Sequence, residues 1–285
     1  MKNLVKKYGD HTAVDHLSFH VEKGQIYGFL GPNGAGKSTT MNIMTGYIAS
    51  TSGEVLIDGH NILEEPEAAK KCIGYLPEQP PLYFDMTVAE YLKFAAELKK
   101  IPKNERETQI EQVMDLTGIT AMANRLIKNL SKGYKQRVGL AQAILGYPEI
   151  IILDEPTVGL DPKQIIEIRE LIKKLSEEHT IILSSHILSE VSAVCDYIMI
   201  INHGKLVASD TTENLMNHSL GSNTLELTVK GEKQDVKNLL RGVEEIQKIE
   251  WKAEENEKTV SMVITTEEKT DIREKLFYMM ADAKM

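Results

Sequence analysis

Apolar residues form four short continuous runs that are separated by longer amphipathic segments. The runs cover residues 25–30, 149–153, 180–184 and 197–201. A strand that is apolar at every position is buried on both faces, as in a parallel sheet covered by helices. Alternation of these strands with helices predicts an α/β doubly wound core.

Other segments alternate between apolar and polar residues, which is typical of strands with one exposed face. Leu17, Phe19 and Val21 alternate within residues 1–24, where Gly9-Asp10 marks a turn, and these residues predict antiparallel strands. Residues 53–59 and 72–77 predict two further strands.

A helical period replaces the strand patterns over residues 82–147. Thr87 and Glu90 form a capping box for a helix over 87–100, and a second helix covers 103–117. Ser131 is the expected N-cap of a third helix, which ends near Leu145. We therefore expect a helical subdomain over about 82–147. Asp161 followed by Pro162 predicts the start of another helix, over 161–175.

A second, smaller α+β domain is predicted after residues 217–223, where the pattern weakens. Strand, helix, strand, strand and helix follow in that order, with a charged turn at 254–258 and the last helix over 267–281. This order is one strand short of a ferredoxin-like unit. The expected domains are residues 1–216 and 221–285, and the second contains no catalytic constellation.

Composition limits the class of protein. The 285 residues carry a formal net charge of -9, which argues against a nucleic-acid-binding surface. The two cysteines have no metal-ligand spacing and are typical of buried residues in a reducing compartment. Because we find neither an 18-residue apolar run nor a signal-peptide core, we expect a cytosolic chain whose membrane role, if any, depends on a partner.

A glycine-rich turn, Gly31-Pro32-Asn33-Gly34-Ala35-Gly36-Lys37-Ser38-Thr39, follows the first apolar run. Its glycines allow successive backbone N–H groups to converge on one point, where the following helix adds its positive end. Lys37 can reach the β- and γ-phosphates of a nucleotide, and the Ser38 hydroxyl can bind Mg²⁺. The turn therefore predicts a nucleoside triphosphate site.

Acidic residues and a histidine follow two of the buried strands. Asp154 ends one strand and can hold Mg²⁺ through water, while Glu155 can orient or deprotonate an attacking water. His186 follows the strand over 180–184, where it could donate a hydrogen bond to the γ-phosphate. The alternative is that these residues only cap helices and pack.

A second anion site is predicted where Ser131 and Gly133 open the third helix. It is too far in sequence from the phosphate loop to belong to it. This separation suggests that two molecules share one nucleotide, although the segment alone could be an ordinary capped helix.

These motifs occur in the order found in ATP-binding-cassette (ABC) transporter ATPases, which the chain resembles over about residues 2–212. The resemblance implies an ABC ATPase fold with a RecA-like core, an antiparallel β subdomain and a helical subdomain. The matching residues are Tyr8 for adenine stacking, Gly31–Thr39 for Walker A, Leu130–Tyr134 for the signature, Ile150–Asp154 with Glu155 for Walker B and the catalytic glutamate, Gly159–Asp161 for the D-loop, and His186 for the switch histidine.

The resemblance also implies a mechanism and partners. Two cassettes, identical or paralogous, would close head to tail around two ATP with Mg²⁺. In each site the phosphate loop of one cassette would bind ATP, opposite Ser131 and Gly133 of the other cassette. The phosphate-loop residues that would bind ATP are Asn33, Gly34, Ala35, Gly36, Lys37, Ser38 and Thr39. Hydrolysis would drive export through separate permease subunits, so the chain would lie on the cytoplasmic face of the membrane.

Three positions depart from the usual family pattern. Lys132 replaces a signature glycine and Tyr134 the signature glutamine. Glu78, rather than Gln79, aligns with the Q-loop glutamine that meets Mg²⁺ or the attacking water, and we keep both as candidates. The departures at the signature and the Q-loop, with the C-terminal extension, resemble the ABC-2 exporter branch. Relative to that branch, we expect a clipped first strand and a missing final strand.

Two other classes of protein remain as alternatives. A soluble ABC ATPase that acts on ribosomes or DNA usually carries two cassettes or a long coiled coil, and neither is found here. A P-loop kinase or GTPase would need an acceptor site or an Asn-Lys-x-Asp segment, which we do not find.

Overall fold

The computed structural model describes residues 1–215, 224–252, 259–267, 270–283 and 285. Within it the chain forms two compact units, Met1–Thr212 and Glu213–Met285. This boundary lies slightly before the one expected at 216. The segment 217–223 and the charged turn at 254–258 lie outside the described residues.

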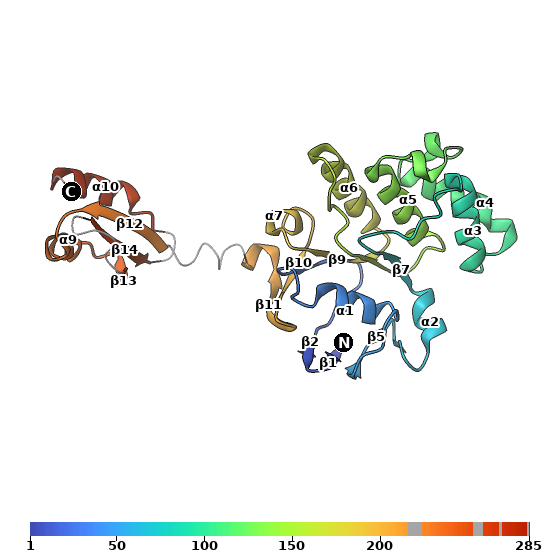
Figure 1. Cartoon of the computed structure of the whole chain (residues 1–285), viewed down its shortest axis with the longest axis horizontal. Coiled ribbons are helices and arrows are strands. Elements are labelled where there is room, and N and C mark those ends of the chain that lie inside the picture. The colour runs from blue at the N-terminus through green and yellow to red at the C-terminus, as the bar shows by residue number, and fades with distance from the viewer. Residues whose placement is uncertain (216–223, 253–258, 268–269, 284) are drawn as a thin grey trace. The chain divides into compact units, whose positions relative to one another are not determined.

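A six-stranded sheet forms the core of the first unit (Figure 1). Five strands are parallel and the edge strand β11 is antiparallel, in the order β11-β10-β3-β9-β8-β7. All four continuous apolar runs lie in this sheet, because its strands are covered on both faces. The strands are β3 (Ile26–Leu30), β7 (Ile73–Leu76), β8 (Ile150–Leu153), β9 (Thr180–Ser185), β10 (Tyr197–Asn202) and β11 (Lys205–Thr211).

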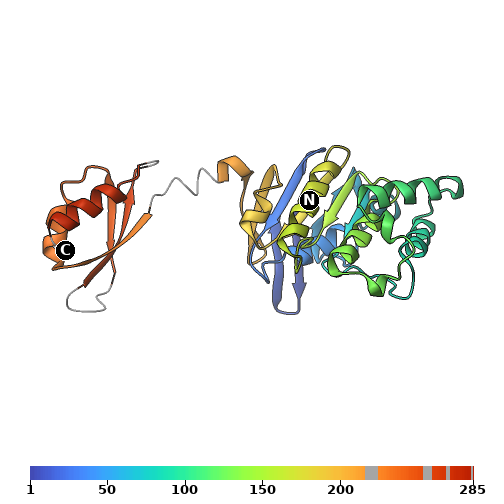
Figure 2. The same ribbon diagram turned by 90° about the horizontal axis from the view of Figure 1, so that it is seen from above.

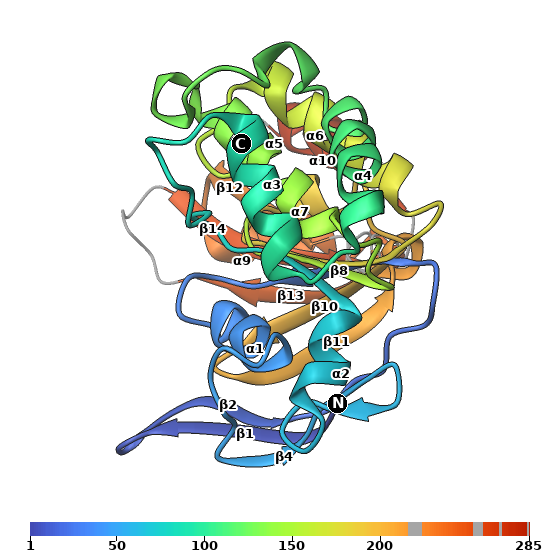
Figure 3. The same ribbon diagram turned by 90° about the vertical axis from the view of Figure 1, so that its right-hand side faces the viewer.

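One face of this sheet is covered by α1 and a small antiparallel sheet of order β2-β1-β4 (Figure 3). Helices α3, α4, α5 and α6 lie on the other side (Figures 1 and 3). The elements are β1 (Lys2–Tyr8), β2 (His11–Leu17), α1 (Lys37–Met44), β4 (Ser52–Glu54), α3 (Val88–Leu98), α4 (Lys103–Leu116), α5 (Lys132–Ile144) and α6 (Pro162–Leu175).

Three predicted helix caps are confirmed. Thr87 and Glu90 form the complete capping box of α3, Ser131 accepts from the N–H of Tyr134 at the start of α5, and Asp161 accepts from the N–H of Gln164 in α6. Each cap satisfies N–H groups that have no acceptor within the helix. The caps therefore fix where these helices begin.

Two strand predictions are wrong in extent. β2 ends at Leu17, and Phe19 lies beyond it, with its ring packed edge-on against Phe29 at 5.2 Å between centroids. Its burial comes from this packing rather than from strand pairing. Residues 53–59 hold parts of two strands, because β4 pairs with β1 while β5 (Leu56–Ile57) pairs with β6 (His60–Asn61).

Short elements complete the unit. The helices α2 (Pro66–Lys71) and α7 (Leu188–Val191) have too few turns to give a periodic signal. Two 3₁₀ turns, Thr120–Met122 and Ile127–Asn129, connect α4 to α5.

The second unit has the predicted order β12 (Thr224–Lys230), α9 (Lys233–Leu240), β13 (Ile246–Trp251), β14 (Thr259–Thr266) and α10 (Arg273–Asp282). Its strands pair antiparallel in the order β12-β14-β13, and both helices lie on one face of the sheet (Figure 2). The last helix begins at Arg273 rather than at 267, because β14 continues to Thr266. A separate apolar core includes Val236, Met262 and Leu276.

Candidate active site

The phosphate loop has the backbone that its glycines allow. Gly34 and Gly36 have φ of +80° and +103°, a region that residues with a Cβ rarely adopt. A Cβ at Gly36 would lie 2.5 Å from the carbonyl oxygen of Ala13. The loop therefore packs closely on β2, and α1 begins at Lys37 with its positive end at the loop.

A cavity of about 510 Å³ opens at this loop and collects most of the predicted site. Its walls come from the β1–β2 hairpin, the phosphate loop and the segments after β7, β8 and β9. The lining residues are Tyr8, His11, Ala13, Asn33, Gly34, Ala35, Gly36, Lys37, Ser38, Thr39, Glu78, Glu155, Val158 and His186.

Glu155 occupies the centre of a charged cluster and is only 7% exposed. Its Oε1 lies 3.4 Å from the ammonium of Lys37, and its Oε2 lies 3.1 Å from Nδ1 of His186. The backbone of Glu155 has a φ of +48°, and its N–H donates to Oγ of Ser184 at 2.9 Å. A left-handed glutamate is strained, and such strain persists where surrounding contacts hold it, often at functional sites.

Lys37 is 6% exposed and is held by the loop itself. Its ammonium donates to the carbonyl oxygens of Gly31 at 2.7 Å and Pro32 at 3.3 Å. With Glu155 beside it, the buried positive charge has acceptors on several sides, which burial of a charge requires.

Ser38 lines the cavity and contacts Asp154, so two oxygen atoms that could bind a metal lie side by side. The Ser38 hydroxyl donates to Oδ1 of Asp154 at 3.3 Å, and the Ser184 hydroxyl donates to the same oxygen at 2.6 Å. Burial, together with the nearby Asp154 carboxylate, raises the pKa of Tyr75 on β7, so this phenol stays neutral. Hydroxyl and carboxylate oxygens are the donor types that suit Mg²⁺.

The family described as "ABC transporter" matches residues 14–158 of the chain. A bacitracin transport ATP-binding protein, BcrA from Bacillus licheniformis, is 44% identical over 207 residues, which cover 72% of this chain and 67% of BcrA. The chain belongs to the ABC transporter family. A lantibiotic transport ATP-binding protein, SrtF from Streptococcus pyogenes, is 38% identical over 75% of this chain and 93% of its own length.

Solved ABC cassettes show the same fold. A dimeric post-hydrolysis structure of the cassette MJ0796, bound to ADP and Pi, has 27% identity and a TM-score of 0.67 over 74% of this chain and 97% of its own. The chain is thus the ATP-binding and hydrolysing subunit of an exporter-type ABC transporter. Among the described helices, none combines the length and apolarity needed to cross a bilayer.

Tyr8 lies at the rim of the ABC cassette's cavity, at the end of β1. It is 50% exposed, and Nζ of Lys6 lies 5.0 Å from its ring centroid. A half-exposed aromatic ring at this position has the chemistry to stack on a planar base.

Four predicted residues are not among the lining residues of their own chain's cavity, and one of them, Asp154, contacts the lining residue Ser38. Gln79 is exposed but is not among the lining residues, in contrast to Glu78. Ser131 caps α5, and Gly133 is buried where a Cβ would meet the amide group of Gln164 on α6. The structure therefore does not bring the signature residues to the phosphate loop of the same ABC cassette.

Sequence reasoning missed several residues that shape the site. His11 and Val158 line the cavity, and Ser184 contacts both Asp154 and Glu155. Glu190 on α7 accepts hydrogen bonds from Thr157 and Ser185. A single sequence carries no periodicity or motif signal for such contacts, because they depend on which strand ends become neighbours.

Proposed function

We propose that two ABC cassettes bind two ATP between them, and that each site pairs the phosphate loop of one cassette with the α5 N-terminus of the other. The observation that carries this proposal is Glu155, held between Lys37 and His186 in a cavity formed by the phosphate loop. The position of Ser131 and Gly133 away from their own cavity supports a shared site. The dimeric MJ0796 cassette, with ADP and Pi, supports it as well.

Each residue at the site has a chemical role in this proposal. Glu155 orients or deprotonates the water that attacks the γ-phosphorus, with ADP as the leaving group. Lys37 and the N–H groups at the start of α1 neutralise phosphate charge, and His186 donates a hydrogen bond to the oxygens that gain charge. Tyr8 stacks on the adenine.

Ser38 and Asp154 would hold Mg²⁺, with Glu78 or Gln79 as a further ligand. Within the described residues no group of three or more His, Cys, Asp or Glu could bind a metal alone, so phosphate and water oxygens would complete the coordination. When bound, Mg²⁺ neutralises charge on the β- and γ-phosphates. Ser184 keeps the Asp154 carboxylate oriented for this role.

The transport pathway is proposed to lie in separate permease subunits. The cassette would bind them on the cytoplasmic face of the membrane, where ATP is available. The permease would select the exported substrate. Co-purification of a multi-span membrane protein with the tagged chain checks this arrangement, and recovery of ribosomes or DNA in its place would contradict it.

Glu155→Gln tests the shared site directly. It keeps the size and hydrogen bonding of the side chain but removes its charge, so ATP hydrolysis should fall ~100-fold or more while ATP binding survives. The variant should then elute as an ATP-dependent dimer in gel filtration. Glu177→Gln, at an exposed position beyond α6, is the control and should behave as wild type. A Glu155→Gln variant that binds ATP but stays monomeric would contradict the proposal.

A further inference from the structure

We propose that Glu190 is a positioning residue that holds the two segments bearing Glu155 and His186 at a fixed separation. Its Oε2 accepts hydrogen bonds from Oγ1 of Thr157 at 2.5 Å and from Oγ of Ser185 at 3.3 Å. Thr157 lies two residues after Glu155, and Ser185 immediately precedes His186. One carboxylate oxygen thus joins both sides of the catalytic pair. This inference rests on the proposed roles of that pair.

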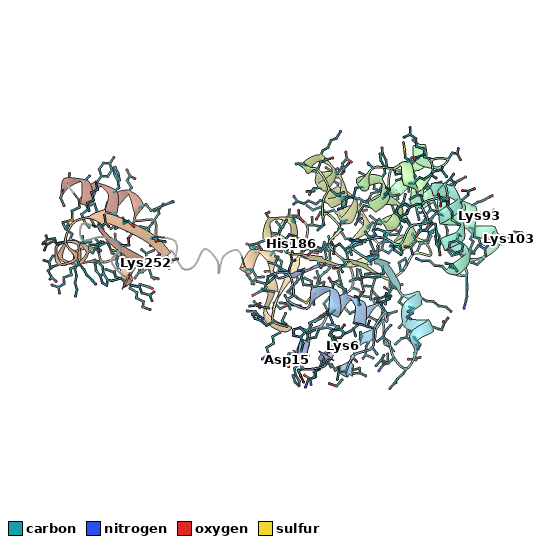
Figure 4. The ribbon with its side chains drawn as sticks, in the orientation of Figure 1. Lys6, Asp15, Lys93, Lys103, His186 and Lys252 are labelled. Carbon is teal, nitrogen blue, oxygen red and sulfur yellow. The ribbon has the colours of Figure 1, made fainter. Side chains whose placement is uncertain are left out.

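The helix that carries Glu190 is anchored to the core sheet. α7 packs against β3 and β9, and its Val191 is completely buried. Gly28 of β3 lies directly beneath Val191, because a Cβ at Gly28 would overlap the Val191 side chain and approach Sγ of Cys195 at 2.9 Å. Close packing of this kind leaves little freedom for α7 to move. Glu190, the neighbour of Val191, therefore projects from a rigid support. Figure 4 shows His186 on the segment between β9 and α7.

The end of β9 is held on both sides of the strand. Successive strand residues point to opposite faces, so Ser184 and Ser185 diverge. Ser184 contacts Asp154 and the N–H of Glu155, while Ser185 donates to Glu190 and accepts from the N–H of Ile187 at 3.1 Å. The turn that carries His186 is therefore tied to the core by Ser185 and Glu190 together.

The hydroxyls that bind Glu190 are removed from water. Thr157 is 7% exposed and Ser185 is 1% exposed. Without the carboxylate, both buried donors would lose this acceptor, and the loop after Glu155 could move to find another. Small displacements in an active site are costly, since a misplacement of about 1 Å can reduce the rate ~100-fold. Binding of ATP by the phosphate loop does not involve this tie.

Glu190→Ala and Glu190→Gln separate positioning from general stability. Glu190→Ala should lower kcat about 10-fold or more while KM for ATP stays unchanged. Glu190→Gln keeps a carbonyl oxygen that accepts from both hydroxyls, so it should restore most of kcat. Ser189→Ala, at an exposed position on the same helix, is the matched control and should not change kcat.

Thr157→Val supplies an independent test if Glu190→Ala folds poorly. Thr157→Val should lower kcat with the same unchanged KM. Where Glu190→Ala folds, the double variant Thr157→Val/Glu190→Ala should lose no more than Glu190→Ala alone, because both substitutions remove the same contact. A normal kcat in Glu190→Ala, a loss in Glu190→Gln as large as in Glu190→Ala, or a raised KM with unchanged kcat would overturn the inference. Failure of the proposed catalytic site itself would appear separately, as normal turnover in Glu155→Gln.

Discussion

His186 and Glu155 are 31 positions apart in the sequence, yet Nδ1 of His186 lies 3.1 Å from Oε2 of Glu155. They meet because β8 and β9 are parallel neighbours, so the residues that follow the two strands emerge at the same edge of the sheet. Lys37 follows β3, the next strand along, and completes the cluster from the other side of Glu155. Sheet order, rather than closeness in sequence, builds this site.

Replacement of Lys37 should separate ATP turnover from folding. In Lys37→Ala we expect hydrolysis to fall to the background rate, because the variant loses the charge that would contact phosphate and that lies beside Glu155. Far-UV circular dichroism should show an intact fold. Lys173→Ala, at an exposed position in the last turn of α6, provides the comparison. Wild-type turnover in folded Lys37→Ala would exclude the assigned role.

Features that depend on local chemistry were predictable from the sequence. The phosphate loop requires glycines at 34 and 36 because of positive φ, and the caps at Thr87, Ser131 and Asp161 are short-range hydrogen bonds. The buried strands were predictable because burial on both faces leaves a continuous apolar run.

Features that depend on tertiary neighbours were not predictable from one sequence. Phe19 alternates with Leu17 as a strand residue would, but its ring packs against Phe29 outside β2. Glu190 looks like an ordinary surface acid of a short helix, and only the order of β8 and β9 brings Thr157 within its reach. The sequence shows which groups are present but not these pairings.

The first unit should bind ATP without the second. The cavity at the phosphate loop is built from residues within Met1–Thr212, and Glu213–Met285 has a buried core of its own. A chain that ends at Asn217 should therefore bind a fluorescent ATP analogue with the affinity of the full chain. Equilibrium titration measures this affinity. An insoluble truncated chain, or one that does not bind the nucleotide, would show that the units depend on each other.

Lys99 should make the stability of the first unit depend on pH. Lys99 directly follows α3. Its ammonium donates to the carbonyl oxygens of Ala143 at 2.8 Å and Leu145 at 2.7 Å, near the end of α5. Burial lowers the pKa of Lys99 to about 8 from 10.5. Between these values the unfolded chain binds a proton that the folded chain releases, so this group makes the free energy of unfolding rise with pH from about 8 to 10.5.

Urea unfolding at pH 8 and at pH 10 checks this sign. Other groups titrate in the same range, so the contribution of Lys99 is measured as the difference in unfolding free energy between wild type and Lys99→Met. That difference should grow in favour of wild type at the higher pH. Lys93→Met, at an exposed position on α3, the helix that Lys99 follows, should show no such pH dependence. An equal difference at both pH values would contradict the assignment.

The last prediction separates Glu78 from Gln79 in the Q-loop. Glu78 lines the cavity together with Ser38 and Glu155, while Gln79 is not among the lining residues. A carboxylate binds Mg²⁺ more strongly than an amide does, although it also repels the γ-phosphate. Pro80 and Pro81 follow, and their fixed φ angles hinder a shift of the loop by one residue that would exchange the two side chains.

We therefore expect Glu78→Ala to reduce Mg²⁺-dependent ATP turnover far more than Gln79→Ala. Because the proposed role is metal binding, the defect in Glu78→Ala should be greatest at low Mg²⁺ and partly recover as Mg²⁺ is raised. Gln79→Ala is the matched control, since both residues are exposed and adjacent on one loop. ATPase rates of the two variants, measured across a Mg²⁺ titration, decide between them. A larger defect in Gln79→Ala would assign the role to Gln79 and would mean that the loop shifts by one residue when nucleotide binds.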